Sequence, residues 1–178
     1  MSYQVIDNLI SWSALESIQK TMLGPDFPWY LHHKVRKDIK LEGHNELYNF
    51  QFIHNFYSNY APCSQFAEIL NPILEALDPA AIIRIKANLT APTPEIIEYG
   101  MHTDYGLGGT TNHSGKSAVF YLNSNNGYTV FEDGTKVDSV ANRLLVFDPH
   151  MVHTGSSSTD SKNRAVINFN YFEWGKKP

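Results

Sequence analysis

The sequence predicts a mainly β protein in which short strands form a sandwich or barrel and two helices lie outside it. Three observations support this prediction. Residues 81–172 contain several short apolar or alternating segments separated by turn-forming residues. The chain has 10 Tyr, 10 Phe and 3 Trp, an aromatic content that suits a β-rich core. Apolar residues with helical spacing are found in two segments of the first half.

Both predicted helices have recognisable boundaries. Ser13-Ala14-Leu15-Glu16 has the pattern of a capping box, and apolar residues keep helical spacing over residues 12–22. Gly24-Pro25 ends this first segment. The second helix is predicted from about residue 64 to residue 77, with one apolar stripe. Because Pro72 falls inside the stripe, a kink or break is expected there.

The predicted strands share alternation of apolar and polar residues, or a short apolar run bordered by turn residues. Residues 124–127 and Asp133-Gly134 supply turn signals. No segment reads as a linker, so we expect one domain over residues 1–178, with 1–80 as support and 81–178 as the barrel core. The predicted strands cover residues 29–35, 50–54, 81–89, 117–123, 128–131, 142–147 and 164–172.

Composition narrows the range of functions. The formal net charge of −4 lacks the basic footprint of a nucleic-acid-binding protein. The chain has one cysteine, Cys63, so no disulfide can form within it, which fits a reducing cytoplasm. The first residues lack the basic and apolar regions of a signal peptide, and no apolar run is long enough to span a bilayer. We therefore expect a cytoplasmic protein without a membrane partner.

The segment with the clearest chemical pattern is Met101-His102-Thr103-Asp104. A His and a carboxylate separated by one residue project to the same side of an extended backbone, so both can reach one metal ion. His153, which follows an apolar strand, could supply a third ligand from a distant part of the sequence. Two imidazoles and one carboxylate form the ligand set of non-haem iron(II) oxygenases, where dioxygen and a cosubstrate occupy the open positions.

Arg164 makes the pattern more specific. It opens the last predicted strand, eleven residues after His153, and its guanidinium is a fixed fork suited to a carboxylate. Val166, Asn168 and Asn170 share its face of the strand, whereas residues 165, 167, 169 and 171 on the other face are apolar or aromatic. A polar face that begins with Arg is unusual for a core strand and reasonable for a strand that lines a ligand pocket.

The ordered set His102-x-Asp104, His153 and Arg164 resembles the iron(II)- and 2-oxoglutarate-dependent oxygenases, in particular the prolyl-4-hydroxylase-like branch. Phe120-Tyr121-Leu122-Asn123 and Gly127-Tyr128-Thr129-Val130-Phe131 resemble segments that follow the metal motif in that branch. The resemblance covers roughly the last hundred residues well and the first eighty in outline. It implies a double-stranded β-helix, or jelly-roll, barrel.

The resemblance also implies roles for individual residues. His102, Asp104 and His153 would bind Fe²⁺, and Arg164 would bind the distal carboxylate of 2-oxoglutarate with a hydrogen bond from Tyr121. Asn88 stands where the branch often has a polar residue near the cosubstrate. The implied reaction is hydroxylation by dioxygen, because halogenating relatives have a small residue in place of Asp104. Collagen-type members have Lys at the position of Arg164, so a proline substrate is not implied.

Several alternatives stay open at this point. His150 competes with His153 as the third ligand, although the spacing in the family favours His153. A cupin-like barrel that binds a metal or a sugar without redox chemistry would not need Arg164. A nucleic-acid demethylase would carry a second Arg six residues after Arg164, where this chain has Asn170. The substrate, a peptide or a small molecule, is expected to contact the loops at 90–99 and 105–116.

Overall fold

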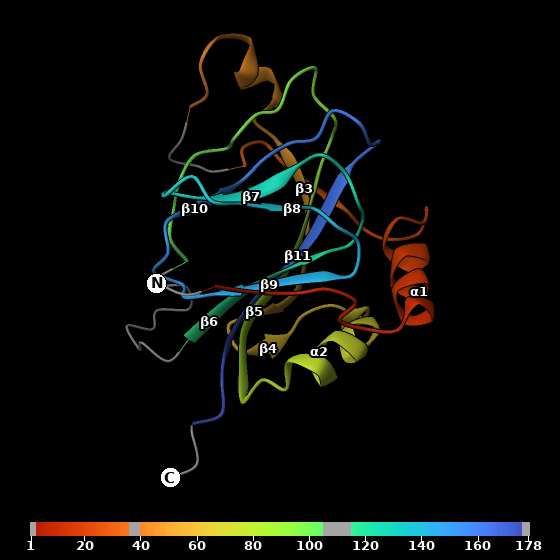
Figure 1. Ribbon diagram of the computed structural model, residues 1–178. Coiled ribbons are helices and arrows are strands. Elements are labelled where there is room, and N and C mark those ends of the chain that lie inside the picture. The colour runs from red at the N-terminus through yellow and green to blue at the C-terminus, as the bar shows by residue number, and fades with distance from the viewer. Residues whose placement is uncertain (1–2, 36–39, 105–114, 176–178) are drawn as a thin grey trace.

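The computed structural model describes residues 3–35, 40–104 and 115–175, which form two antiparallel sheets that face each other (Figure 1). The main path of the larger sheet has the order β1-β9-β6-β11-β5-β3-β2, and β4 pairs with β3. Its strands are β1 (Tyr3–Ile6), β9 (Arg143–Phe147), β6 (Gly115–Tyr121), β11 (Arg164–Phe172), β5 (Ala81–Thr90), β3 (Gln51–Ser58), β2 (Tyr30–His32) and β4 (Ala61–Pro62).

The smaller sheet has the order β10-β7-β8. Its strands are β10 (His153–Gly155), β7 (Tyr128–Phe131) and β8 (Lys136–Asp138). The extended segment 97–102 runs antiparallel to the other edge of β10, through the bridges Glu98–Ser156 and His102–His153. This pairing carries the predicted metal motif to the edge of the smaller sheet, opposite the inner face of the larger one.

The helices begin and end close to the predicted positions, with two differences. Helix α1 spans Trp12–Met22, but its N-cap is Ser11, whose hydroxyl accepts from the Ala14 amide, and not Ser13. The second predicted helix is divided into a 3₁₀ turn, η2 (Ala67–Leu70), and α2 (Asn71–Leu77), with Pro72 in the first turn of α2. Pro is tolerated there because the amides of a first turn have no partner within the helix. A further 3₁₀ helix, η1, spans Gly43–Tyr48.

The larger of the two hydrophobic clusters lies on the outer face of the larger sheet. Both helices cover this face (Figure 1) and bury apolar side chains, among them Leu15, Ile18 and Ile73, against the strands. Strand β11 contributes its odd-numbered residues 165–171, all buried, so the predicted division of this strand into an apolar and a polar face is confirmed. The strands of the larger sheet are therefore stabilised mainly by apolar packing on their outer face, opposite the inner face that looks toward the smaller sheet.

A smaller apolar cluster lies between the sheets and includes Val119, Tyr121, Phe131, Phe147 and Val166. The mainly β architecture with flanking helices is confirmed. Strand β1 was not predicted, because its four residues carry no turn signals, and it pairs with β9 at the edge of the sheet. Within the described ranges, no helix is both long and apolar enough to cross a membrane.

Candidate metal centre and ligand cavity

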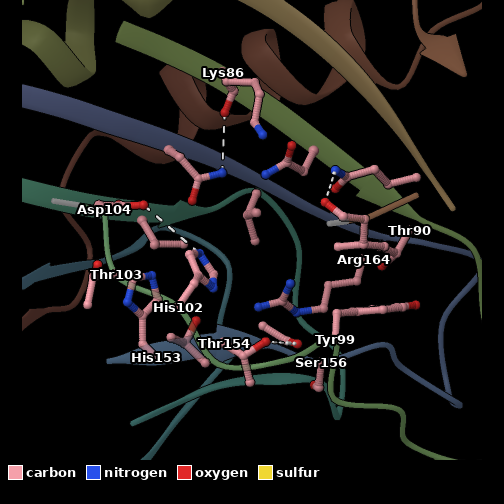
Figure 2. A pocket seen from close by; sticks show the side chains of 18 of the residues that line it. Lys86, Thr90, Tyr99, His102, Thr103, Asp104, His153, Thr154, Ser156 and Arg164 are labelled. Atoms are coloured by element: carbon pink, nitrogen blue, oxygen red, sulfur yellow. Dashed lines mark hydrogen bonds and ion pairs between the residues drawn. The ribbon is translucent and has the colours of Figure 1, made fainter. Parts of the chain in front are cut away.

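A cavity of about 220 Å³ lies between the two sheets. Its walls come from β5, β6 and β11 on one side and from β7, β10 and residues 99–104 on the other. Figure 2 shows His102, Asp104 and His153 gathered on one side of this cavity, with Arg164 and Tyr99 on the other. Its volume is below the roughly 300–1,000 Å³ of pockets for drug-sized ligands, so a small occupant fits it best.

Backbone hydrogen bonds hold His102 and His153 side by side, and backbone carbonyls orient their rings. The His102 amide donates to the His153 carbonyl and the His153 amide to the His102 carbonyl, each at 2.8 Å, and the ring centroids lie 4.5 Å apart. Nδ1 of His153 lies 2.9 Å from the Met151 carbonyl, and Nδ1 of His102 lies 3.4 Å from the Gly100 carbonyl. An Nδ1–H donated to a carbonyl leaves Nε2 as the lone-pair donor, which is the arrangement of a metal-ligating imidazole.

Asp104 completes the cluster. Ligand atoms of His102, Asp104 and His153 all lie within 4.8 Å of one another, and Asp104 Oδ1 is 4.0 Å from His102 Nε2. The other oxygen, Oδ2, accepts from Ser117 Oγ at 2.7 Å and from Asn170 Nδ2 at 3.1 Å. These bonds orient the carboxylate so that Oδ1 faces the imidazoles. The donor set therefore suits one divalent ion after small side-chain rotations.

The same contacts keep Asp104 ionised. Burial alone would raise its pKa, but the electrostatic interaction with His153, the Ser117 hydrogen bond and the guanidinium of Arg84 outweigh burial, so the pKa lies below its usual value. An ionised carboxylate is the form that binds a metal ion.

Arg164 lies at the far end of the cavity and is only 5% exposed. Its Nε donates to Ser139 Oγ at 2.9 Å and its Nη2 to the Tyr128 carbonyl at 3.2 Å. These bonds use two of the five N–H groups of a guanidinium. Within the part of the chain that the structure describes, the others have no acceptor. Burial lowers the pKa of Arg164, and no carboxylate lines this end of the cavity among the described residues.

Two polar atoms beside Arg164 lack partners. Thr90 is the register partner of Arg164 on β5, and Asn88 lies two residues before it on the same face. Thr90 Oγ1 and Asn88 Oδ1 are buried, and neither has a hydrogen-bond partner among the described residues. Buried polar groups are almost always paired, so these two indicate a ligand or water with polar atoms of its own.

The hydroxyl of Tyr121 is engaged inside the protein. It donates to Thr129 Oγ1 at 2.8 Å, and Thr129, not Tyr121, is among the residues that line the cavity. The Tyr121 ring is fully buried, with the Arg164 guanidinium 5.8 Å from its centroid. A direct bond from Tyr121 to a ligand carboxylate stays a prediction.

His150 lies apart from the metal-ligand cluster. Its Nδ1 lies 2.8 Å from Asp148 Oδ1, and its side chain is 35% exposed. The group of potential ligands found in the described ranges contains His153 and not His150. Of the loops expected to contact substrate, residues 90–99 are described and reach the cavity through Thr90 and Tyr99, whereas 105–114 lie outside the described residues.

Sequence reasoning missed three cavity residues. Tyr99 stands three residues before His102 on the same extended segment, and burial raises its pKa to about 12. Arg84 lines the cavity together with Lys86. By contrast, Arg143 forms a salt bridge with Asp7, at 2.6 and 3.1 Å.

No family model and no curated protein sequence matches the chain. Solved structures do match it. A Trichoplax adhaerens prolyl hydroxylase in complex with a hypoxia-inducible-factor peptide aligns with 96% of this chain and 83% of its own, at 13% identity and a TM-score of 0.64. The viral collagen prolyl hydroxylase of Paramecium bursaria Chlorella virus-1, a 2-oxoglutarate complex, aligns over 98% and 97%, at 13% identity and a TM-score of 0.62.

A third structure is HygX from Streptomyces hygroscopicus, with nickel, 2-oxoglutarate and hygromycin B bound. It aligns over 96% of this chain and 82% of its own, at 12% identity and a TM-score of 0.60. At such identities the likeness concerns the fold, and the matched proteins differ in what they bind. The chain therefore has the jelly-roll fold of the 2-oxoglutarate- and iron(II)-dependent oxygenases, a group that includes the prolyl hydroxylases.

Proposed function

We propose that this protein is a non-haem iron(II)- and 2-oxoglutarate-dependent dioxygenase that hydroxylates its substrate. One observation carries the proposal: a cluster of two imidazoles and one carboxylate shares a small cavity with a buried arginine that has no carboxylate partner among the described residues. The cluster alone would fit many metal proteins. The arginine at the far end of the same cavity adds the requirement for an anionic cosubstrate.

His102, Asp104 and His153 would hold the metal through the Nε2 atoms and Oδ1. The carbonyls of Gly100 and Met151 fix the tautomers of the two imidazoles. When bound, iron(II) and 2-oxoglutarate supply the oxidation: dioxygen is reduced as the cosubstrate is decarboxylated to succinate and carbon dioxide, and the substrate gains a hydroxyl group.

Arg164 would hold the distal carboxylate of 2-oxoglutarate with the N–H groups that Ser139 and Tyr128 leave free. Thr90 and Asn88 would use their unpaired polar atoms in the same region. Tyr121 would contribute by orienting the Thr129 hydroxyl, or by turning its own hydroxyl toward the carboxylate. Phe131 and Phe147 lie beside the His153 ring and would limit the access of water to the metal side.

The test is succinate formation from 2-oxoglutarate by protein loaded with Fe²⁺. His153→Ala should abolish it, because the metal loses a ligand. His150→Ala is the matched control, since it removes the competing imidazole three residues away, and it should leave turnover within about twofold of wild type. Loss of turnover in His150→Ala but not in His153→Ala would refute the ligand assignment. Metal binding without any 2-oxoglutarate turnover or binding would favour the non-redox, cupin-like alternative.

A further inference from the structure

Strand β5 presents to the cavity two cations, Arg84 and Lys86, that are neither among the proposed metal ligands nor opposite Arg164 in the sheet. Alternate residues of this strand point inward, and Arg84, Lys86, Asn88 and Thr90 all line the cavity. Their neighbours Ile85 and Ala87 belong to the outer hydrophobic cluster. The direction of both cations is thus fixed by the pleat of a central strand and not by a surface loop.

Of the two cations, Lys86 has fewer interaction partners. Among the described residues, its ammonium has neither a hydrogen-bond nor an ion-pair partner, and its half-buried stem runs along the wall of the cavity (Figure 2). Burial, followed by repulsion from Arg84, lowers the pKa of Lys86 to about 8, although the carboxylate of Asp104 acts in the opposite direction. Charged groups held away from water without a counter-ion are unfavourable, so this position favours an occupant with negative charge.

Arg84 is only partly engaged. Its Nε donates to Asn170 Oδ1 at 3.1 Å, and Asn170 in turn donates to Asp104. In the described ranges, Arg84 forms no ion pair, and the two terminal nitrogens of its guanidinium have no acceptor. Arg84 therefore steadies the metal-ligand network through one nitrogen and leaves the paired end of its fork free to bind an anion.

The register of the sheet separates these cations from Arg164. On the neighbouring strand β11, Arg164 lies opposite Thr90, whereas Asn168 lies opposite Lys86 and Asn170 opposite Arg84. Four and six residues along a strand correspond to about 13 Å and about 20 Å between backbone positions. One carboxylate bound by Arg164 does not also neutralise Lys86 and Arg84, so the cavity has two separate places for negative charge.

A count of charges leads to the same conclusion. Among the described lining residues, three cations, Arg84, Lys86 and Arg164, face the single carboxylate of Asp104. An iron(II) ion and a 2-oxoglutarate dianion would cancel each other. Two positive charges stay uncompensated in the loaded site, inside a chain whose net charge is −4. Such a field attracts anions and repels cations.

We infer that the substrate is a small anion whose carboxylate or phosphate group binds Lys86 and Arg84 beside the metal centre. The inference rests on the proposed function and adds the chemical class of the substrate. The charged group would sit between the Lys86 ammonium and the free end of the Arg84 fork, and the carbon to be hydroxylated would lie between this group and the metal ligands. A neutral or cationic analogue of the same shape would bind poorly.

The inference can be tested by ¹⁹F NMR with two probes of matched shape, 4,4,4-trifluorobutyrate and 4,4,4-trifluorobutyramide. The protein is loaded with Mn²⁺ and saturating 2-oxoglutarate, and a Zn²⁺-loaded sample provides the diamagnetic reference. The butyrate signal should broaden in the Mn²⁺ sample because the probe binds close to the metal, whereas the amide signal should not. Inorganic phosphate, added as a competitor, distinguishes a carboxylate from a phosphate substrate. If phosphate reverses the broadening of the butyrate signal at concentrations below that of the butyrate, the site favours the phosphate class.

Three variants make the test specific. Lys86→Met should weaken butyrate binding by at least about tenfold, the loss of one charge-assisted hydrogen bond. Lys86→Arg, which keeps the charge, should restore binding to within a few-fold. Lys20→Met removes the same charge from the exposed last turn of α1 and should change nothing. Equal broadening by the amide, or unchanged butyrate binding in Lys86→Met, would overturn the inference.

Separate titration of 2-oxoglutarate into the Mn²⁺ protein keeps this outcome distinct from failure of the proposed function. Lys86→Met should bind 2-oxoglutarate within about twofold of wild type, whereas Arg164→Ala should lose it. If Lys86→Met lost the cosubstrate and Arg164→Ala retained it, the β5 cations would be the cosubstrate site and the inference would be wrong. If wild type bound the butyrate but no 2-oxoglutarate, the anion site would stand and the proposed function would fall.

Discussion

Gly127 controls the position of Arg164, and Gly127→Ala tests this relation directly. A Cβ at Gly127 would lie 2.6 Å from Arg164 Cδ and 2.6 Å from the Ser157 carbonyl oxygen. Real Cβ atoms do not approach so closely, so either the backbone or the Arg164 side chain must move. The Gly127 carbonyl also accepts from the Ser139 amide, and Ser139 Oγ accepts from Arg164 Nε, so the displacement reaches the anchor of the guanidinium.

The expected magnitude has two parts. Overpacking at a buried position costs about 1–3 kcal/mol, and a chain of this size loses about 2–4 °C in Tm for each kcal/mol. Displacement of the fork should weaken 2-oxoglutarate binding to the Mn²⁺ protein by about tenfold or more, the value of one charge-assisted hydrogen bond. A thermal melt measures the loss of stability, and calorimetric titration measures the loss of 2-oxoglutarate affinity.

Gly115→Ala is the matched control. Among the described residues, the atoms nearest to a Cβ at Gly115 lie 3.8 and 4.0 Å away, which is ordinary contact. This variant should bind 2-oxoglutarate as wild type does. In an Arg164→Ala background, Gly127→Ala should cause no further loss of 2-oxoglutarate affinity, because the residue that transmits the effect is gone. Gly127→Ala with wild-type 2-oxoglutarate affinity would refute the reasoning.

Three further outcomes are expected. Arg164→Lys keeps the charge but loses the fork, so the KM for 2-oxoglutarate should rise, and it should rise much further in Arg164→Ala; equal KM values in steady-state succinate assays would contradict this. Ser117→Ala removes one of the two hydrogen bonds to Oδ2 of Asp104 and should weaken Mn²⁺ binding by about tenfold, as measured by electron paramagnetic resonance titration. In metal-free protein at pH 7, Lys86→Met should be more stable to urea than wild type, because wild type buries a charged ammonium. This advantage should shrink as pH rises from about 8 toward 10.5, where the unfolded chain still binds the proton that the folded chain has released; a pH-independent difference would contradict it.

The sequence predicted the fold where the strand period is clear. The alternation along β11 identified its buried and cavity-facing residues, and Pro72 marked the division of the second helix. It missed the role of Arg84 and Lys86, because alternation along β5 shows only that they share a face. Whether this face meets solvent or a cavity depends on the pairing of β5 with β11, a contact between residues about eighty positions apart. The Ser117 and Asn170 bonds to Asp104 depend on the pairing of β6 with β11, which is also long-range, and could not be predicted either.

The division of the larger sheet into a packed outer face and a cavity-facing inner face has a consequence for the evolution of such a protein. The larger hydrophobic cluster packs toward α1 and α2, whereas the cavity-lining residues of β5 and β11 point away from the helices. An inward residue such as Lys86 or Asn168 can be exchanged without disturbing the packing on which folding depends. Ligand preference in this architecture can therefore evolve faster than the fold, because the ligand-contacting residues and most of the packing residues lie on opposite faces of the same strands.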